Sequence, residues 1–129
     1  MRDDSATGMI RVLIVDHPPA VRRTLRARLS LEPDLMVVEE AGDAPSAAAL
    51  AQALRPDVIL LDAEMPHLDV QAAVRAIRGQ SPSSAVVVLS LDAGAERARG
   101  AEGATSVGKH EGTAALLAAI RCAAGRQGP

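Results

Sequence analysis

The sequence predicts a single α/β domain in which five parallel strands form one sheet with helices on both faces. Five apolar stretches are spaced by about 20 to 30 residues, and each gap has room for one helix, which is the arrangement of a doubly wound (βα)5 domain. The third stretch, residues 57–62, holds four consecutive aliphatic residues without polar alternation, which is typical of a strand buried on both faces. A length of 129 residues suits one such domain and is too short for two.

The composition is that of a soluble globular protein. Hydrophobic residues make up 48% of the chain and charged residues 23%, and the formal net charge of -2 gives no electrostatic reason to expect binding to nucleic acid or a membrane surface. No apolar run approaches the ~18 residues that span a bilayer, and the acidic start at residues 1–4 differs from a secretory signal. The single cysteine, Cys122, allows no internal disulfide. We therefore expect a cytoplasmic location.

The chain opens with a polar segment, residues 1–8, which is predicted to be a disordered extension of a domain spanning residues 9–125. A buried strand follows at residues 10–15. Apolar residues then recur at helical spacing with arginines between them, which predicts an amphipathic helix with a solvated arginine face. The apolar positions are Val21, Leu25 and Leu29, and the arginines are Arg22, Arg23, Arg26 and Arg28. A second strand is predicted at residues 35–38.

Helix start and stop signals surround the central strand. Asp43 or a neighbouring residue is expected to cap an alanine-rich helix that stops before Pro56. The central strand then ends on a carboxylate, Asp62. Asp69 is predicted to cap the next helix and Gly79 to end it, because aspartate favours the first position of a helix and glycine the position after its last turn.

The fourth strand is a valine-rich run at residues 85–89 that stops at Ser90. Residues 92–100 have a helical composition but no stripe of long apolar side chains, which predicts a weak or mobile helix.

The C-terminal part begins with a short strand at residues 104–107 that leads to Lys109. Thr113 is predicted to cap the last helix, whose buried side consists of Leu116, Leu117 and Ile120. Residues 126–129 are expected to form a tail that could begin a linker to a missing output domain.

Polar side chains follow four of the five predicted strands, at Asp16, Asp62, Ser90 and Lys109. The carboxyl ends of parallel strands meet at one edge of a sheet, so these groups are expected to lie together. Two carboxylates there would hold a divalent cation, while a hydroxyl and an ammonium would take the oxygens of a tetrahedral anion. The pattern therefore predicts a place where a phosphoryl group is attached to an aspartate. Taken alone, Asp62 could simply end its strand or cap a turn.

Other phosphate sites are not indicated. Residues 17–19, which follow the first strand, contain no glycine, so neither the dinucleotide fingerprint nor a P-loop is present, and the chain has no G-x-S-x-G motif. Nothing in the sequence supplies a substrate pocket, and an enzyme is not expected.

The chain from residue 10 to about residue 125 resembles the receiver domains of two-component response regulators, which have a flavodoxin-like fold. The motifs that carry the resemblance appear in order at βα spacing: Val15-Asp16 with Pro19 and Val21-Arg22, Asp62 with Met65-Pro66, Ser90, and Lys109 after Gly103-Ala104. Three further segments are similar to receivers of the NarL/FixJ group, whose full-length members carry a C-terminal helix-turn-helix: Glu32-Pro33-Asp34, Ala41-Gly42-Asp43 and Arg55-Pro56-Asp57.

The resemblance implies a role for each site residue. Asp62 would accept a phosphoryl group from a histidine kinase or phosphotransfer protein, and Ser90 and Lys109 would contact that group. Asp16, Asp62 and the backbone carbonyl of Glu64 would hold Mg²⁺. The family further implies a phosphoprotein in transcription regulation that contacts DNA only through an output domain absent from this chain, with a homodimer as a further assembly and no membrane partner.

Several positions depart from the family pattern. His17 stands where most members have a second acid that touches the metal, and imidazole suits Mn²⁺ better than Mg²⁺. Leu91 replaces a small residue and could obstruct the phosphorylation site. The chain has no Phe, Tyr or Trp, so Ser106 or Val107 must take the place of the aromatic switch residue on the last strand.

These departures leave two pairs of alternatives open. A protonated His17, stabilised by nearby carboxylates, could partly replace the metal charge and make phosphorylation less dependent on Mg²⁺; alternatively, His17 caps its loop and the metal site is lost. The whole domain is either a phosphoacceptor switch or a pseudo-receiver, meaning an interaction or dimerisation module that works without phosphorylation.

Overall fold

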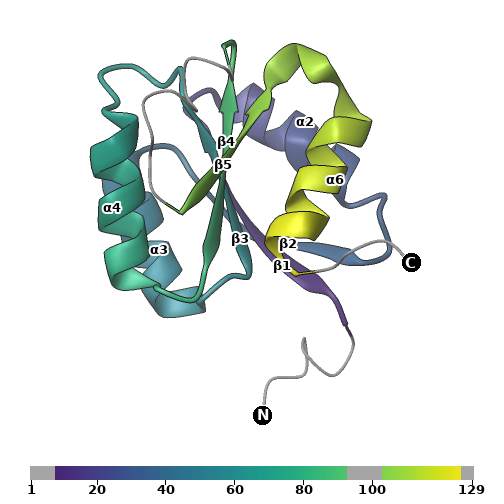
Figure 1. The fold of residues 1–129 in the computed structure, drawn as a ribbon, viewed down its shortest axis with the longest axis horizontal. Helices are drawn as coiled ribbons and strands as arrows, with labels where there is room; N and C mark the ends of the chain where they lie inside the picture. The colour runs from purple at the N-terminus through teal and green to yellow at the C-terminus, as the bar shows by residue number, and fades with distance from the viewer. Residues whose placement is uncertain (1–7, 93–102, 126–129) are drawn as a thin grey trace.

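The computed structural model of the chain describes residues 8–92 and 103–125. It contains one sheet of five parallel strands in the order β2-β1-β3-β4-β5, which confirms the predicted doubly wound α/β architecture (Figure 1). The strands are β1 (Ile10–Val15), β2 (Leu35–Ala41), β3 (Val58–Asp62), β4 (Ala85–Ser90) and β5 (Ala104–Gly108). The helices are α2 (Pro19–Leu29), α3 (Ala44–Leu54), α4 (Val70–Gln80), the 3-10 turn η1 (Lys109–Glu111) and α6 (Thr113–Ala123).

Helices cover both faces of the sheet. Helices α2 and α6 pack on one face and α3 and α4 on the other, as Figure 1 shows with the sheet seen between the two pairs. Alternate residues of the central strands serve the two faces, so that Leu60 packs toward α2 and α6, whereas Ile59 and Leu61 pack toward α3 and α4. All five residues of β3 are buried, which confirms the prediction from its unbroken aliphatic run.

The predicted helix caps are confirmed at two positions and wrong at two others. Asp43 Oδ1 accepts the backbone N–H of Ser46 at 2.8 Å, and Asp69 Oδ1 caps α4 in the same way. Gly79 does not end α4, because it keeps a helical conformation and the helix continues to Gln80. Thr113 is the first residue of α6 and does not cap it. Gly112 occupies the cap position with φ of 97°, a conformation that glycine adopts at little cost and threonine does not.

The sequence predicted a solvated arginine face on α2, but several of these arginines form ion pairs with carboxylates. Arg22 Nε and Arg26 Nη1 both contact Glu40 at the end of β2, at 3.3 and 2.8 Å, and Arg28 pairs with Glu32. These ion pairs tie α2 to the neighbouring strand β2 and to the turn between them. Spacing within the helix does not indicate these carboxylates, because Glu40 lies on β2 and Glu32 lies beyond the end of α2.

Three predicted features fall outside the residues that the structure describes. They are the disordered extension (apart from Gly8), the weak helix from residue 93 onward, and the tail at residues 126–129. Within the described residues, the helices lack the length and apolar character needed to cross a membrane.

Candidate functional site

The register of the sheet brings the four predicted site residues to one edge. Asp62 is the last residue of β3 and pairs with Leu89, so Ser90 follows directly beside it on β4. Ser90 in turn pairs with Gly108, which immediately precedes Lys109. On the other side of β3, Val15 pairs with Leu61, which places Asp16 next to Asp62. Parallel pairing alone therefore collects these side chains at the carboxyl edge of the sheet.

Lys109 and Asp62 form the central ion pair of the site. The Lys109 ammonium lies 2.6 Å from Asp62 Oδ1, which also accepts the backbone N–H of Glu64 at 3.0 Å. Burial lowers the pKa of Lys109, but its hydrogen bonds to Asp62 and Glu64 outweigh this effect and raise that pKa overall. Lys109 is the only lysine of the chain, so no second ammonium can replace it.

Asp16 is a buried carboxylate in contact with a second carboxylate. It is 3% exposed, and the register of β1 and β3 places it beside the Asp62 carboxylate. Burial, followed by hydrogen bonding to Asp62 and the negative charge of Asp62, raises the pKa of Asp16 to about 6, against the opposing effects of Lys109 and the backbone N–H of His17. Two carboxyl groups this close favour either a shared proton or a cation between them.

The donor set of this site fits a hard divalent cation such as Mg²⁺. Asp16 Oδ1 is buried and has no hydrogen-bond partner within the described part of the chain, which leaves a carboxylate oxygen available for a metal ion. The described residues contain no cluster of three or more His, Cys, Asp or Glu side chains able to hold a metal. The ligand set of the cation would therefore consist of the two carboxylates together with backbone oxygen and water. Ligation by the Glu64 carbonyl stays a prediction.

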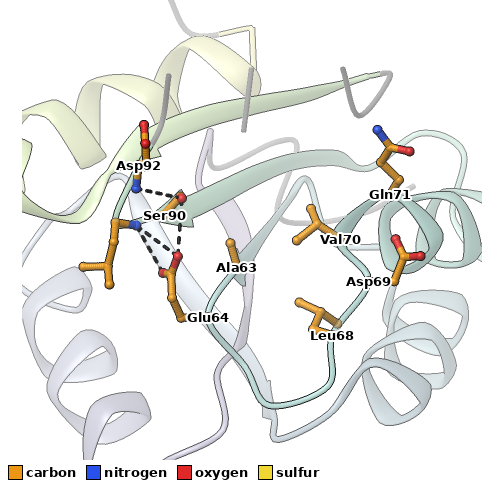
Figure 2. Close-up of a pocket in the computed structure, with 9 residues that line it drawn as sticks. Ala63, Glu64, Leu68, Asp69, Val70, Gln71, Ser90 and Asp92 are labelled. Carbon is orange, nitrogen blue, oxygen red and sulfur yellow. Dashed lines mark hydrogen bonds between the residues drawn. The ribbon is translucent and has the colours of Figure 1, made fainter. Parts of the chain in front are cut away.

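Ser90, Leu91 and Lys109 present three hydrogen-bond donors to one point, and we call Ser90 Oγ, Leu91 N and Lys109 Nζ the anion-donor cluster. The cluster is engaged by the side chain of Glu64, a residue that the sequence indicated only for its backbone. Ser90 Oγ lies 3.4 Å from Glu64 Oε2, the Leu91 N–H donates to both Glu64 oxygens at 3.2 Å, and Lys109 Nζ lies 3.1 Å from Glu64 Oε1. Figure 2 shows the Glu64 carboxylate directed toward Ser90. The only indication of this contact in the sequence is that Glu64 is a carboxylate two positions after Asp62.

The two unusual residues of the site have different surroundings. His17 is exposed and lines a cavity of about 330 Å³ together with Asp16, Asp62 and Lys109. The Leu91 side chain does not line this cavity and is 61% exposed; it borders a neighbouring cavity of about 530 Å³ (Figure 2). Leu91 therefore contributes its N–H to the site and does not close it.

Arg22 is a further residue that the sequence did not place at the site. Its Nη1 donates to the carbonyl oxygens of Asp16 and His17, both at 2.8 Å, and thereby holds the loop after β1. Helical spacing does not distinguish Arg22 from the other arginines of the helix, and the Val21-Arg22 motif of the family resemblance assigned it no contact. In chemical terms, the edge of the sheet offers two carboxylates to a cation and, beside them, an ammonium, a hydroxyl and an amide to an anion.

Comparisons with known proteins agree with this arrangement. A model of the response regulator receiver domain family matches residues 12–121. A protein-glutamate methylesterase/protein-glutamine glutaminase 3 from Myxococcus xanthus is 48% identical over 82 residues, which are 64% of this chain and 23% of that protein. The chain spans about a quarter of the length of the curated relatives it matches.

Two solved structures extend the comparison to nearly the whole chain. The response regulator domain of Thermotoga maritima CheB matches with a TM-score of 0.76 and 32% identity, over 94% of this chain and 99% of that one. The receiver domain of the putative response regulator NarL from Mycobacterium tuberculosis matches with a TM-score of 0.79 and 29% identity, over 92% and 98%. Relatives with different names thus share this one domain.

Proposed function

The chain belongs to the response regulator receiver domain family, and from this premise we propose that it is a phosphorylation-controlled switch of two-component signalling. In this proposal Asp62 accepts a phosphoryl group from a histidine kinase or phosphotransfer protein in the cytoplasm. The phosphorylated domain, residues 9–125, then alters a protein-interaction face, and any contact with DNA or regulation of transcription is made by an output domain outside this chain. A homodimer is part of the same proposal.

The observation that carries the proposal is the 2.6 Å contact between Lys109 and Asp62, with Ser90 on the adjacent strand. A carboxylate oxygen of Asp62 attacks phosphorus and forms a P–O bond, while the bond from phosphorus to the donor's imidazole nitrogen breaks and its electron pair leaves with the imidazole. The Lys109 ammonium and the Ser90 hydroxyl compensate the charge on the transferred oxygens. Asp16 and Asp62 would hold Mg²⁺, which supplies further charge neutralisation when bound.

A second candidate function is the pseudo-receiver, a phosphorylation-independent interaction or dimerisation module. Two observations favour it: His17 replaces an acid at the metal site, and the side chain of Glu64 engages the anion-donor cluster. The retained Lys109–Asp62 pair favours the phosphoacceptor.

Labelling with acetyl phosphate separates the two candidates. In the presence of Mg²⁺, we expect the intact chain to gain one phosphoryl group, seen by mass spectrometry and mapped to Asp62, because this carboxylate is the one held against the lysine. The Asp62→Asn variant, in which an amide replaces the nucleophile, should gain none. A matched control is Asp69→Asn, which changes a carboxylate in the loop after β3 that lies outside the cavity around Asp62. A wild-type chain that stays unlabelled would favour the pseudo-receiver.

The two hypotheses for His17 give different metal dependence. Because His17 is exposed, water screens its charge, and we expect labelling to require Mg²⁺ across about pH 5.5 to 8. His17→Asp should lower the Mg²⁺ concentration for half-maximal labelling roughly thirtyfold, since a unit charge about 4 Å from a divalent ion contributes about 2 kcal/mol even in water. His17→Asn is the neutral control. Labelling in EDTA that rises as the pH falls would instead support replacement of the metal charge by imidazolium.

A further inference from the structure

The position of the Glu64 carboxylate is the least expected feature of the site. Its two oxygens lie 3.1 to 3.4 Å from the three donors of the anion-donor cluster, namely Ser90 Oγ, Leu91 N and Lys109 Nζ. The Ser90 hydroxyl also accepts the N–H of Asp92 at 3.1 Å, which leaves its own proton directed to Glu64. One carboxylate therefore engages every donor of the cluster at once.

A phosphoryl group on Asp62 would require the same donors. It would carry anionic oxygens, as the Glu64 carboxylate does, and would have to reach Ser90 and Lys109 from an attachment point on the adjacent strand. Each of these donors already has Glu64 as an acceptor. The two anions cannot both be satisfied by one hydroxyl, one amide and one ammonium without sharing them.

We propose that the Glu64 carboxylate is a built-in substitute for the phosphoryl group, which occupies the anion-donor cluster before phosphorylation and must be displaced for Asp62 to be phosphorylated. This inference rests on the proposed phosphoacceptor function and adds a regulating residue to it. Glu64 acts through the donors and not as a catalytic residue.

The geometry of Glu64 is that of a displaceable group. Its side chain is 34% exposed, and its contacts with all three donors, at 3.1 to 3.4 Å, are longer than a typical charge-assisted hydrogen bond. Asp62, by contrast, is buried and holds its lysine at 2.6 Å. An incoming dianion can therefore take over the donors while Glu64 turns into solvent.

Electrostatic repulsion by Glu64 opposes phosphorylation in addition to its competition for the donors. The carboxylates of Asp62 and Glu64 contact the single ammonium of Lys109, and Asp16 lines the same cavity. Glu64 repels an incoming phosphoryl donor as well as competing with it. Removing the charge of Glu64 should therefore speed the reaction even in a variant of the same shape.

The test compares labelling rates with acetyl phosphate and Mg²⁺ in wild type, Glu64→Gln and Glu64→Ala. We expect both variants to be labelled on Asp62 roughly tenfold faster than wild type, the amide because it is neutral and the methyl because it leaves the donors open. Glu39→Gln is the matched control, because it removes the same charge from an exposed position on β2 and should leave the rate unchanged. Equal rates for Glu64→Gln and wild type would overturn the inference while leaving the proposed function intact.

A second measurement tests the occupation of the donors by Glu64 separately from phosphorylation, whereas a lack of labelling in every variant would reject the phosphoacceptor function itself. Hydrogen exchange by NMR reports on the Leu91 amide, and the single lysine makes the Lys109 ¹⁵Nζ signal unambiguous. In the unphosphorylated wild type the Leu91 amide should be protected, and Glu64→Ala should expose it and shift the Lys109 signal. Unchanged Leu91 exchange in Glu64→Ala would overturn the inference. Labelling of Glu64→Gln in the absence of wild-type labelling would support it.

Discussion

Replacing Lys109 by methionine is expected to reduce acetyl-phosphate labelling of Asp62 by about a hundredfold or more, the cost of removing a preorganised group that stabilises developing charge. The ammonium lies 2.6 Å from Asp62 and 3.1 Å from Glu64, and methionine keeps most of the aliphatic stem without the charge. The variant should also lower the free energy of unfolding by roughly 1–3 kcal/mol, because the buried Asp62 loses its partner beside another carboxylate. The lower end of that range applies if water reaches Asp62 from the exposed third of Lys109.

Arg75→Met is a suitable control for the lysine substitution, because it removes a positive charge from an exposed position on α4. It should change neither the labelling rate nor the urea denaturation midpoint appreciably. Since the chain has no other lysine, any labelling left in Lys109→Met measures the contribution of Ser90, the backbone amides and the metal. Labelling at the wild-type rate would contradict the assignment of Lys109 to the phosphoryl group.

The strands could be predicted from the sequence because the pattern that indicates each strand is local. The aliphatic runs of β1, β3 and β4 need only a period of two or an unbroken apolar stretch to be recognised, and parallel pairing then decides which ends meet. Asp62, Ser90 and Lys109 can be predicted in this way from the strand ends alone. The site could thus be predicted to the extent that it depends on strand ends.

Long side chains that cross between elements were not predictable in the same way. Arg121 of α6 donates to both carboxylate oxygens of Asp34, which lies 87 positions earlier in the chain, and no periodicity relates the two. Ser84, which directly precedes β4, is buried and donates to the carbonyl of Pro56 at 2.5 Å. The contacts of the Glu64 side chain were unpredictable for the same reason. Glu64 lies in a loop, where its side chain could point in several directions, and the positions of the donors in three dimensions select one of them.

Stability in EDTA should fall as the pH rises from about 4 to 6, because of Asp16. Its pKa is raised from 3.8 to about 6 by burial and by Asp62, so between these values the folded chain binds a proton that the unfolded chain has released. Protonation therefore favours the folded state in this window, and above pH 6 the folded state bears the full cost of a charged Asp16. The difference of 6 - 3.8 = 2.2 units corresponds to at most about 3 kcal/mol, and coupling to Asp62 makes roughly 1–3 kcal/mol a reasonable expectation.

Asp16→Asn isolates this contribution, because an amide has nearly the same shape, does not titrate and can donate to Asp62. Urea denaturation at a series of pH values should show that the variant lacks the loss of stability between pH 4 and 6 and is more stable than wild type in EDTA above pH 6. Excess Mg²⁺ should reverse this order, since the cation stabilises only the chain that keeps both carboxylates. Asp43→Asn provides the opposite control: hydrogen bonds from Ser46 lower the pKa of Asp43, so its contribution to stability is lost as the pH falls. If Asp16→Asn kept the wild-type slope, the carboxylate pair would not be the group that couples folding, protons and metal at this edge of the sheet.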